Sequence, residues 1–195
     1  MTRTPQLIGI CGFKGAGKST VVHQAIFDPR EMDHALPVFQ MSIMQPVRNM
    51  LSAMGIQDID NKAKWDDPQP LLNHKSIRHA VITLGTDWAR DYIGPDVWID
   101  IAIRDARATM LQGTTVVIDG IRYWNEYEAV RAEGGIMIAF HRPDLPYAPH
   151  IETERHISKI QKQCDRRFEN VTGEYNASVH RMRSLLLELT AAVPA

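Results

Sequence analysis

The chain has 195 residues, with 22 Lys and Arg against 23 Asp and Glu, and hydrophobic residues make up 44% of it. This length and composition are typical of one globular domain with a continuous core. Because the net charge is close to zero, the molecule as a whole does not attract a polyanion, which disfavours duplex nucleic acid as an obligate partner. No stretch approaches the roughly 18 consecutive apolar residues of a membrane span, and MTRTPQ is not a signal peptide. We therefore expect a cytoplasmic protein with no membrane partner.

The N-terminal part of the chain alternates short apolar runs with helical patterns. Residues 6–11 (QLIGIC) predict a buried strand, and a glycine-rich turn at 12–17 follows it. A helix is predicted at 18–27, where Asp28-Pro29 ends it. A second strand at 36–41 and a helix at 46–54, which opens on Pro46, complete this part.

The middle of the chain begins with a polar, irregular excursion at 55–75. Helical spacing returns at 76–90, where the apolar residues share one face of the predicted helix and so place Trp88 in the core. Those residues are Ile77, Ala80, Val81, Leu84 and Trp88. Residues 96–111 predict another helix, although alternating isoleucines at its start leave a strand open.

The C-terminal part contains the most β-branched run, at 114–118 (TTVVI), which predicts a central parallel strand. A helix at 125–132 and a strand at 136–140 follow. Residues 141–160 are rich in Pro, His and charge, so we expect them to contribute little to the core. A last helix is predicted to begin at the cap Asn176. Its predicted inward side chains are Val179, Met182, Leu185, Leu186 and Leu189. The alternation predicts a three-layer α/β fold with a parallel sheet of about five strands.

The motif that carries most chemistry is GFKGAGKS at residues 12–19, which satisfies G-x-x-x-x-G-K-[ST] between a predicted strand and a predicted helix. Glycines let successive backbone N–H groups turn inward into an anion nest, and the helix N-terminus adds favourable partial charge. In such a loop Lys18 reaches the β- and γ-phosphates and the Ser19 hydroxyl ligates Mg²⁺. The sequence therefore predicts a P-loop NTPase fold with ATP and Mg²⁺ as cofactors.

Asp119 directly follows the predicted central strand. Ligands of a doubly wound sheet bind beyond the carboxyl ends of its strands, so a carboxylate there could hold Mg²⁺. The alternative is that Asp119 only caps the turn that follows it.

Several arginines fall near predicted strand ends, helix starts or the segment after the last predicted strand. Phosphoryl transfer needs cations around the migrating group, and Arg supplies them with a rigid bidentate fork. Arg122 and Arg142 each follow a predicted strand within a few residues, and Arg142-Pro143 opens a predicted mobile lid at about 142–160. A closing lid excludes water and so favours transfer over hydrolysis. For each of these arginines a solvated surface position remains the alternative. The candidates are Arg48, Arg78, Arg90, Arg122, Arg142 and Arg155.

Aromatic and cysteine residues give weaker signals. Trp98 and Trp124 are open between stacking on a base and packing in the core. Cys11 ends an apolar run and is predicted to be a buried small hydrophobe. The spacing of His and Cys matches no common zinc site.

Four segments together resemble the phage-type deoxynucleoside monophosphate kinases. In chain order they read GFKGAGKST, MQPVRNMLSAMG, IRHAVITLGTDWARDYIGPDVW and VVIDGIRYWNEYEAVRAEGG, followed by HRP. The element LGTDWARD followed by Pro-Asp-x-Trp is the most specific to the family. The resemblance implies transfer of phosphate from ATP to a deoxynucleoside monophosphate, in host cytoplasm if the protein is phage-encoded. It also implies one kinase domain over 1–195 with an acceptor-binding insertion at about 42–100, and it leaves a homodimer open.

The resemblance carries roles onto individual positions. ATP would be bound by Gly12, Lys14, Gly15, Ala16, Gly17, Lys18, Ser19 and Thr20. The acceptor would be bound by Arg48, Arg78, Gly85, Thr86, Asp87, Trp98, Arg122 and Glu126, with residues 84–87 forming a turn. Catalysis would involve Lys18, Asp119, Arg122 and Arg142, and the metal would be held by Ser19 and Asp119.

Two positions depart from the family pattern. Ser19 stands where many members have Asp, and Gly120 stands where the family has its acidic residue, with Asp119 one position earlier. A shift of one residue re-aims a side chain at a strand end.

Three other functions remain open from the sequence. A related P-loop kinase would phosphorylate the hydroxymethyl group of 5-hydroxymethyluracil in phage DNA, along a basic groove of Arg48, Arg78, Arg104 and Arg107. A dephospho-coenzyme A kinase is a further option. The last is a nucleotide-dependent switch or binding module with no small-molecule acceptor.

Overall fold

The computed structural model describes residues 5–27, 36–146 and 152–191. The chain divides into two compact units, the first made of Met1–Ser42 and Ala102–Ala195 and the second of Ile43–Ile101. Part of the predicted lid, residues 147–151, lies outside the described residues. Within the described ranges, no helix combines the length and the apolarity that crossing a membrane requires.

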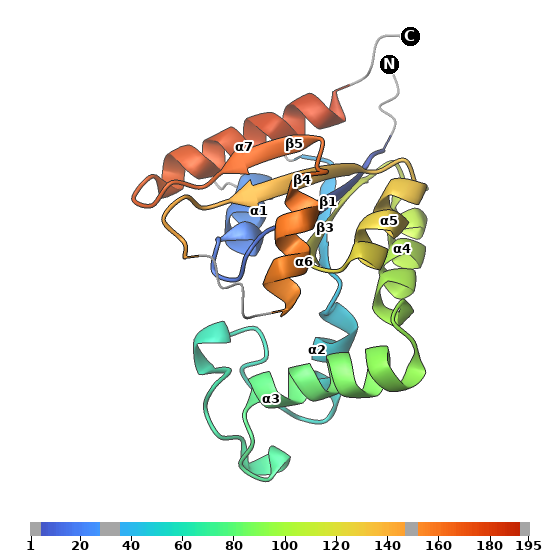
Figure 1. Cartoon of the computed structure of the whole chain (residues 1–195), viewed down its shortest axis with the longest axis vertical. Helices are drawn as coiled ribbons and strands as arrows, with labels where there is room; N and C mark the ends of the chain where they lie inside the picture. Colours follow the sequence, from blue (N-terminus) through green and yellow to red (C-terminus); the bar gives the residue numbers. More distant parts are fainter. Residues whose placement is uncertain (1–4, 28–35, 147–151, 192–195) are drawn as a thin grey trace. The chain divides into compact units, whose positions relative to one another are not determined.

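A five-stranded sheet forms the centre of the first unit, in the order β2-β3-β1-β4-β5, and every pairing is parallel (Figure 1). The strands are β1 (Leu7–Cys11), β2 (Val38–Ser42), β3 (Thr115–Ile121), β4 (Ile136–His141) and β5 (Arg166–Glu169). All five residues of β1 are buried, as expected for the middle strand of a parallel sheet with both faces covered. The predicted α/β P-loop NTPase fold is confirmed, with the glycine-rich loop directly after the central strand.

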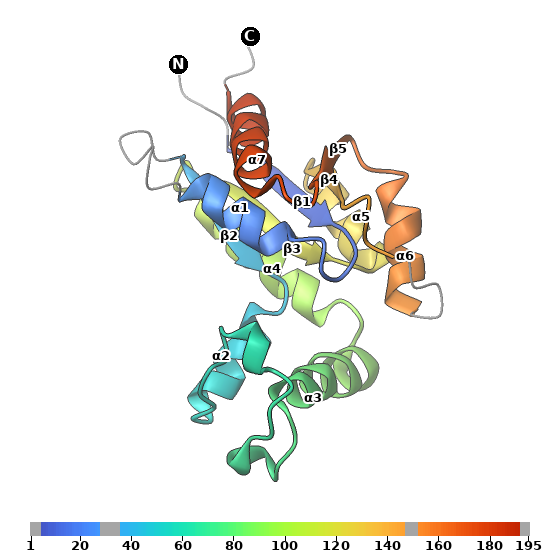
Figure 2. The ribbon, with the colours of Figure 1, turned by 90° about the vertical axis from the view of Figure 1, so that its left-hand side faces the viewer.

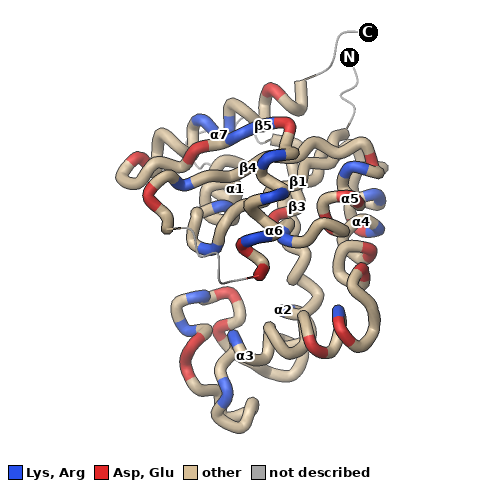
Figure 3. Tube along the Cα trace, viewed as in Figure 1, with Lys and Arg blue, Asp and Glu red and all other residues tan. Residues whose placement is uncertain are grey.

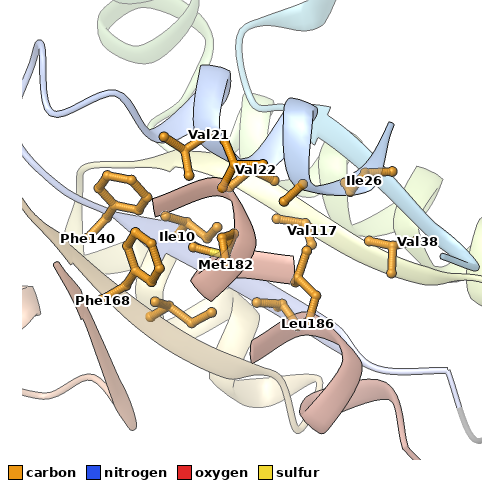
Figure 4. Packing of buried hydrophobic residues seen from close by; sticks show 14 of the residues in the cluster. Ile10, Val21, Val22, Ile26, Val38, Val117, Phe140, Phe168, Met182 and Leu186 are labelled. Atoms are coloured by element: carbon orange, nitrogen blue, oxygen red, sulfur yellow. The ribbon is translucent and has the colours of Figure 1, made fainter. Parts of the chain in front are cut away.

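Two helices, α1 (Lys18–Ile26) and α7 (Tyr175–Thr190), pack on one face of the sheet and on each other. Alternate strand residues point to this face, because successive side chains of a strand point to opposite sides. Figure 4 shows the resulting core, in which the apolar stripes of both helices meet strand residues such as Ile10, Val117 and Phe140. Asn176, which the sequence predicts as the cap of the last helix, lies inside α7, since the helix begins one residue earlier.

Helices α5 (Trp124–Ala132) and α6 (Glu152–Gln161) contact β1 and β4 and cover the opposite face (Figure 2). The expectation that residues 141–160 contribute little to the core is wrong, because Ile157 and Ile160 of α6 are 1% and 0% exposed. Strand β5, with the sequence RRFE, is not predicted from the sequence: only Phe168 of its four residues is buried. An edge strand with three exposed charged residues has no apolar alternation to reveal it.

The second unit is helical. Its elements are α2 (Gln45–Ala53), the 3₁₀ turns η2 (Lys62–Lys64) and η3 (Pro70–Leu72), α3 (Ile77–Ile82) and the π-helix η4 (Thr83–Ile93). Helix α4 (Val97–Met110) begins in this unit and ends in the first. The predicted helix at 76–90 therefore forms, but its second half has i→i+5 hydrogen bonding, which changes the angle between successive side chains. For that reason the predicted core position of Trp88 is wrong, and this side chain is 43% exposed.

The packing of α7 gives a matched test of the core. Leu186 is 0% exposed and its neighbour Leu187 is 42% exposed. Leu186→Ala should lower the free energy of unfolding by about 2–5 kcal/mol, because a buried leucine leaves both lost contacts and a cavity. Leu187→Ala should cost well under half as much in urea denaturation. Equal losses for the two variants would contradict the assignment of the buried face of α7.

Candidate nucleotide-binding site

The first position of the P-loop, Gly12, leaves no room for a side chain. A Cβ on Gly12 would lie 2.4 Å from the backbone oxygen of Phe140, so the loop starts in direct backbone contact with β4. Gly17 has a φ of 87° and lies in the left-handed region immediately before α1. The loop therefore presents its amides at the N-terminus of α1, which is where a helix attracts anions.

Lys18 is the first residue of α1 and is 8% exposed. Its ammonium group donates to the carbonyl oxygens of Gly12 at 2.7 Å and Phe13 at 2.9 Å. The cation thus lies over the loop and is available to a phosphate that displaces these carbonyls. Among the other predicted ATP-binding residues of the loop, Lys14, Gly15 and Thr20 are exposed and Ala16 is buried.

Asn170 contacts the P-loop at Ala16, and the sequence alone does not identify this residue. It follows β5, is 9% exposed, and its Nδ2 donates to the carbonyl oxygen of Ala16 at 2.8 Å. A Cβ on Gly17 would lie 2.7 Å from the same nitrogen. Asn170 therefore fixes the half of the P-loop that leads into α1.

Arg142 follows β4 and contacts the P-loop at Gly15. Its Nη1 donates to the carbonyl oxygen of Gly15 at 3.4 Å, and its Nε donates to the Thr172 hydroxyl at 3.0 Å. Asp144 lies beside the guanidinium group, with an oxygen 3.4 Å from Nε. Hydrogen bonding from Thr172, together with the nearby arginine, holds the pKa of the Asp144 carboxyl below its usual value. The structure thus places Arg142 against the P-loop, and its catalytic role stays a prediction.

Asp119 lies on the face of the sheet that α1 covers. Val117 belongs to the core on that face, and Asp119 comes two residues later in the same strand. Asp119 is 5% exposed, and its carboxylate accepts a hydrogen bond from Nε2 of Gln40 at 2.7 Å. The same nitrogen lies 3.3 Å from the carbonyl oxygen of Ser19. One amide group therefore joins the strand-end carboxylate to the first turn of α1.

Gln40 is a site residue that sequence reasoning misses. It lies in β2, and its two acceptors are 79 and 21 residues away in the chain. Both acceptors are oxygen atoms, so the NH₂ group of the amide must face them. No short motif contains this residue, and only the pairing of β2 with β3 places it at the site.

A β-bulge directly follows Asp119 in β3. The register between β1 and β3 changes so that Ile10 pairs with Asp119 and Cys11 pairs with Ile121. Gly120 is the extra residue, with a φ of 91°. The bulge thus adds one residue between Asp119 and Arg122 that the pairing with β1 does not use.

These groups fit a bound Mg²⁺. This ion keeps several waters and uses one or two protein oxygens together with phosphate oxygens, so it needs no cage of carboxylates. The described residues contain no group of three or more His, Cys, Asp or Glu side chains able to hold a metal. The Ser19 hydroxyl and the buried Asp119 carboxylate would hold the ion. When bound, it would neutralise charge on the β- and γ-phosphate oxygens.

Arg122 and Glu126 have different surroundings at the start of α5. The Arg122 side chain is exposed. Glu126 is 1% exposed, and its Oε2 accepts from the backbone N–H groups of Arg122 at 2.7 Å and Tyr123 at 3.1 Å. This is a cap of the helix N-terminus. In this conformation Oε2 of Glu126 caps the helix, and the contact of Glu126 with a nucleoside stays a prediction.

In the second unit the structure brings Arg48 and Arg78 together on one indole. Their Cζ atoms lie 5.8 and 5.9 Å from the centroid of the Trp65 ring, within the range of a cation–π interaction. Trp65 is 8% exposed and donates from Nε1 to the carbonyl oxygen of Ile59 at 2.9 Å. Arg78 also forms a bidentate pair with Asp66, in which Nη2 and Oδ2 are 2.9 Å apart. Trp65, which the sequence places in an irregular excursion, thus organises two predicted acceptor residues.

The predicted acceptor turn at 84–87 is part of the π-helix η4. Gly85 is buried there, and its carbonyl oxygen accepts from Nε1 of Trp98 at 2.8 Å and from Arg90 at 3.1 Å. Thr86 is half-buried and Asp87 is exposed. Trp98 is 3% exposed, so its ring serves the packing of this unit, and its contact with an acceptor base stays a prediction.

The role of Gln40 can be tested without measuring turnover. Gln40→Ala removes the donor to a buried carboxylate, which costs about 1–3 kcal/mol of stability and releases Asp119 from its position. We expect the variant to need about tenfold more Mg²⁺ than wild type for half of the maximal thermal stabilisation by ATP, because loss of a residue that orients a metal ligand weakens metal binding. Gln112→Ala, at an exposed position, should leave the Mg²⁺ requirement unchanged. An unchanged requirement in Gln40→Ala would show that Gln40 does not position a metal ligand.

Comparisons with known proteins give distant likenesses only. No protein-family model matches the chain, and no curated protein sequence matches it. Among solved structures, shikimate kinase from Aquifex aeolicus is 14% identical, with a TM-score of 0.49 over 94% of this chain and 96% of that chain. Shikimate kinase from Bacteroides thetaiotaomicron is 12% identical, with a TM-score of 0.46 over 93% and 98%. TT1252 from Thermus thermophilus is 15% identical, with a TM-score of 0.40 over 97% and 100%. At these identities and TM-scores the likenesses say nothing about what the chain binds or acts on.

Proposed function

We propose that the chain is an ATP-dependent phosphotransferase whose acceptor is a deoxynucleoside monophosphate. The observation that carries the proposal is the P-loop with the Lys18 ammonium group folded over it, 2.7 Å from the Gly12 carbonyl oxygen. Arg142 and Asn170 contact the same loop, at the carbonyl oxygens of Gly15 and Ala16. A loop fixed at several points is preorganised for a triphosphate, because little ordering remains for the ligand to impose.

The chain's own residues support direct transfer between two nucleotides. An oxygen of the acceptor phosphate forms a bond to the γ-phosphorus of ATP while the bond from that phosphorus to the leaving ADP oxygen breaks. The acceptor phosphate is already an anion near neutral pH, so no strong general base is required. Lys18 and Arg142 would neutralise charge on the oxygens of the migrating group. Asp119 would help to hold the metal in the arrangement that Gln40 maintains.

The arginine pair on Trp65 supports a phosphomonoester as the acceptor. Such a group carries between one and two negative charges near neutral pH, whereas each phosphate of a DNA strand carries one. Because Arg78 already forms an ion pair with Asp66, the acceptor must compete with this carboxylate for the guanidinium group. The more highly charged monoester competes better. Lys and Arg are also interleaved with Asp and Glu along the chain trace (Figure 3), which does not favour an extended polyanion.

One assay tests the proposed acceptor. The protein is incubated with γ-labelled ATP and, separately, with each deoxynucleoside monophosphate, each hydroxymethylated monophosphate, dephospho-coenzyme A and DNA that contains 5-hydroxymethyluracil. We expect label in at least one deoxynucleoside diphosphate. Label in DNA alone, or in dephospho-coenzyme A alone, would replace the proposed acceptor by that one, and ATP binding without transfer to any acceptor would indicate a switch or binding module.

A pair of lysine variants serves as the control for this assay. Lys18→Ala should lower turnover by about 10²–10³, as loss of one preorganised charge donor does. Lys162→Ala, at an exposed position after α6, should keep wild-type turnover. Near-full activity of Lys18→Ala would remove Lys18 from the mechanism.

Arg78 provides a separate test of acceptor binding. Arg78→Ala should raise the KM for the acceptor about tenfold or more, because a hydrogen bond to a charged group contributes about 1.5–3 kcal/mol. The KM for ATP should change much less, since the predicted ATP-binding residues lie in the P-loop. Lys75→Ala, an exposed neighbour, should change neither value. A similar rise in both KM values for Arg78→Ala would indicate a general structural role instead.

A further inference from the structure

The two cysteines of the chain, Cys11 and Cys164, lie side by side in the first unit. Their Sγ atoms are 3.5 Å apart, although 153 residues separate them in the sequence. Both are free thiols. The described residues offer no cluster of three or more metal-ligating side chains around them, so the pair has the composition of a dithiol site and not that of a metal site.

Cys11 is fixed in the centre of the sheet. It is the last residue of β1, is 0% exposed, and is flanked by β3 on one side and β4 on the other. Ile10 points to the face that α1 and α7 cover. Because successive side chains of a strand point to opposite faces, Cys11 points to the face that α5 and α6 cover. The hydrogen bond with Cys164 and burial raise the pKa of the Cys11 thiol well above its usual value, so this sulfur stays protonated. Gly12, the first residue of the P-loop, follows immediately.

Cys164 is held in place by hydrogen bonds of its own side chain and of the next residue. It is half-buried and lies between α6 and β5, and its thiol donates to the carbonyl oxygen of Ile160 at 3.4 Å. The next residue, Asp165, accepts from the Met137 backbone N–H at 2.8 Å and from Arg131 at 2.7 Å. These bonds tie the segment to β4. Cys164 is therefore partly exposed, whereas Cys11, whose sulfur lies 3.5 Å from that of Cys164, is fully buried.

We propose that Cys11 and Cys164 form an oxidation site that closes to an intramolecular disulfide in the presence of a peroxide. The Cys164 sulfur, as thiolate, attacks one oxygen of hydrogen peroxide, which gives a sulfenic acid and releases hydroxide. The Cys11 sulfur then bonds to the Cys164 sulfur while the S–O bond breaks, and the proton of the Cys11 thiol passes to the departing hydroxyl group, which leaves as water. Overall, two thiols and one peroxide give one disulfide and two waters, and the two sulfurs supply the two electrons.

The geometry requires little movement for this step. The sulfurs must approach from 3.5 Å to the bonding distance of about 2.05 Å. Because β1 is paired on both sides, the shift falls on the turn between α6 and β5. The bond would fasten that turn to the strand that carries the P-loop, and it would close a loop of 153 residues. Closing so long a loop restricts the unfolded chain strongly, so an unstrained bond stabilises the fold.

The test uses the full-length protein and needs no kinase activity, so it can fail or succeed independently of the proposed function. Reduced protein is freed of reductant, treated with hydrogen peroxide, blocked with an alkylating reagent and digested for mass spectrometry. We expect a cross-linked peptide pair lighter by two hydrogens than the sum of its thiol forms. We also expect a midpoint of thermal unfolding higher by on the order of 10 °C, and reversal of both changes by dithiothreitol.

Two variants provide the controls, Cys164→Ser at the accessible position and Cys11→Ala at the buried one. Neither should show the cross-link or the reversible rise in the midpoint. The proposal is overturned if peroxide leaves both thiols open to alkylation, if Cys164 proceeds to sulfinic acid beside a free Cys11, or if the bond forms between two molecules. A cross-link that lowers the unfolding midpoint would contradict the unstrained geometry.

Discussion

The backbone contact between Gly12 and β4 is the constraint on which the nucleotide site depends. A Cβ at Gly12 would lie 2.4 Å from the Phe140 carbonyl oxygen, so the P-loop leaves the sheet along the surface of its neighbouring strand. Because β1 pairs in parallel with both β3 and β4, the carboxyl ends of the three strands lie at one edge. Arg142 after β4 and Asp119 near the end of β3 therefore arrive beside the loop without any local signal that connects them.

Sequence patterns predict the parts of this site that lie close together in the chain. The glycine and lysine spacing of the P-loop, the β-branched run before Asp119 and the apolar run before Arg142 are each complete within about ten residues. Gln40 and Asn170 are not predictable in this way, because their partners Asp119 and Ala16 are 79 and 154 residues away. A single amide side chain in a strand or a turn has no distinguishing neighbours in sequence. Only the strand order shows what it contacts.

Periodicity fails where the backbone departs from the regular period. Trp88 would lie on the buried face of an α-helix with Ile77 and Val81, but the π-helix begins at Thr83 and turns it outward. Trp98, a second indole from the next helix, occupies the interior and bonds to the carbonyl of Gly85. In α6, two isoleucines at the spacing of one helical turn bury fully within a segment whose overall composition is polar. Composition averaged over a segment hides such pairs.

The bulge at Gly120 shows why spacing in sequence is a poor guide to spacing in a site. Counted along the chain, the acidic residue before Arg122 is one position too early for the family that the sequence resembles. In the pairing of β1 with β3, however, Gly120 is skipped, because Ile10 and Cys11 pair with Asp119 and Ile121. Glycine makes this possible, since a φ of 91° excludes most other residues. The position of the Asp119 carboxylate is therefore set by the pairing of Asp119 with Ile10 and by the hydrogen bond from Gln40. The number of residues between two motifs therefore does not give the spacing of their side chains where a bulge lies between them.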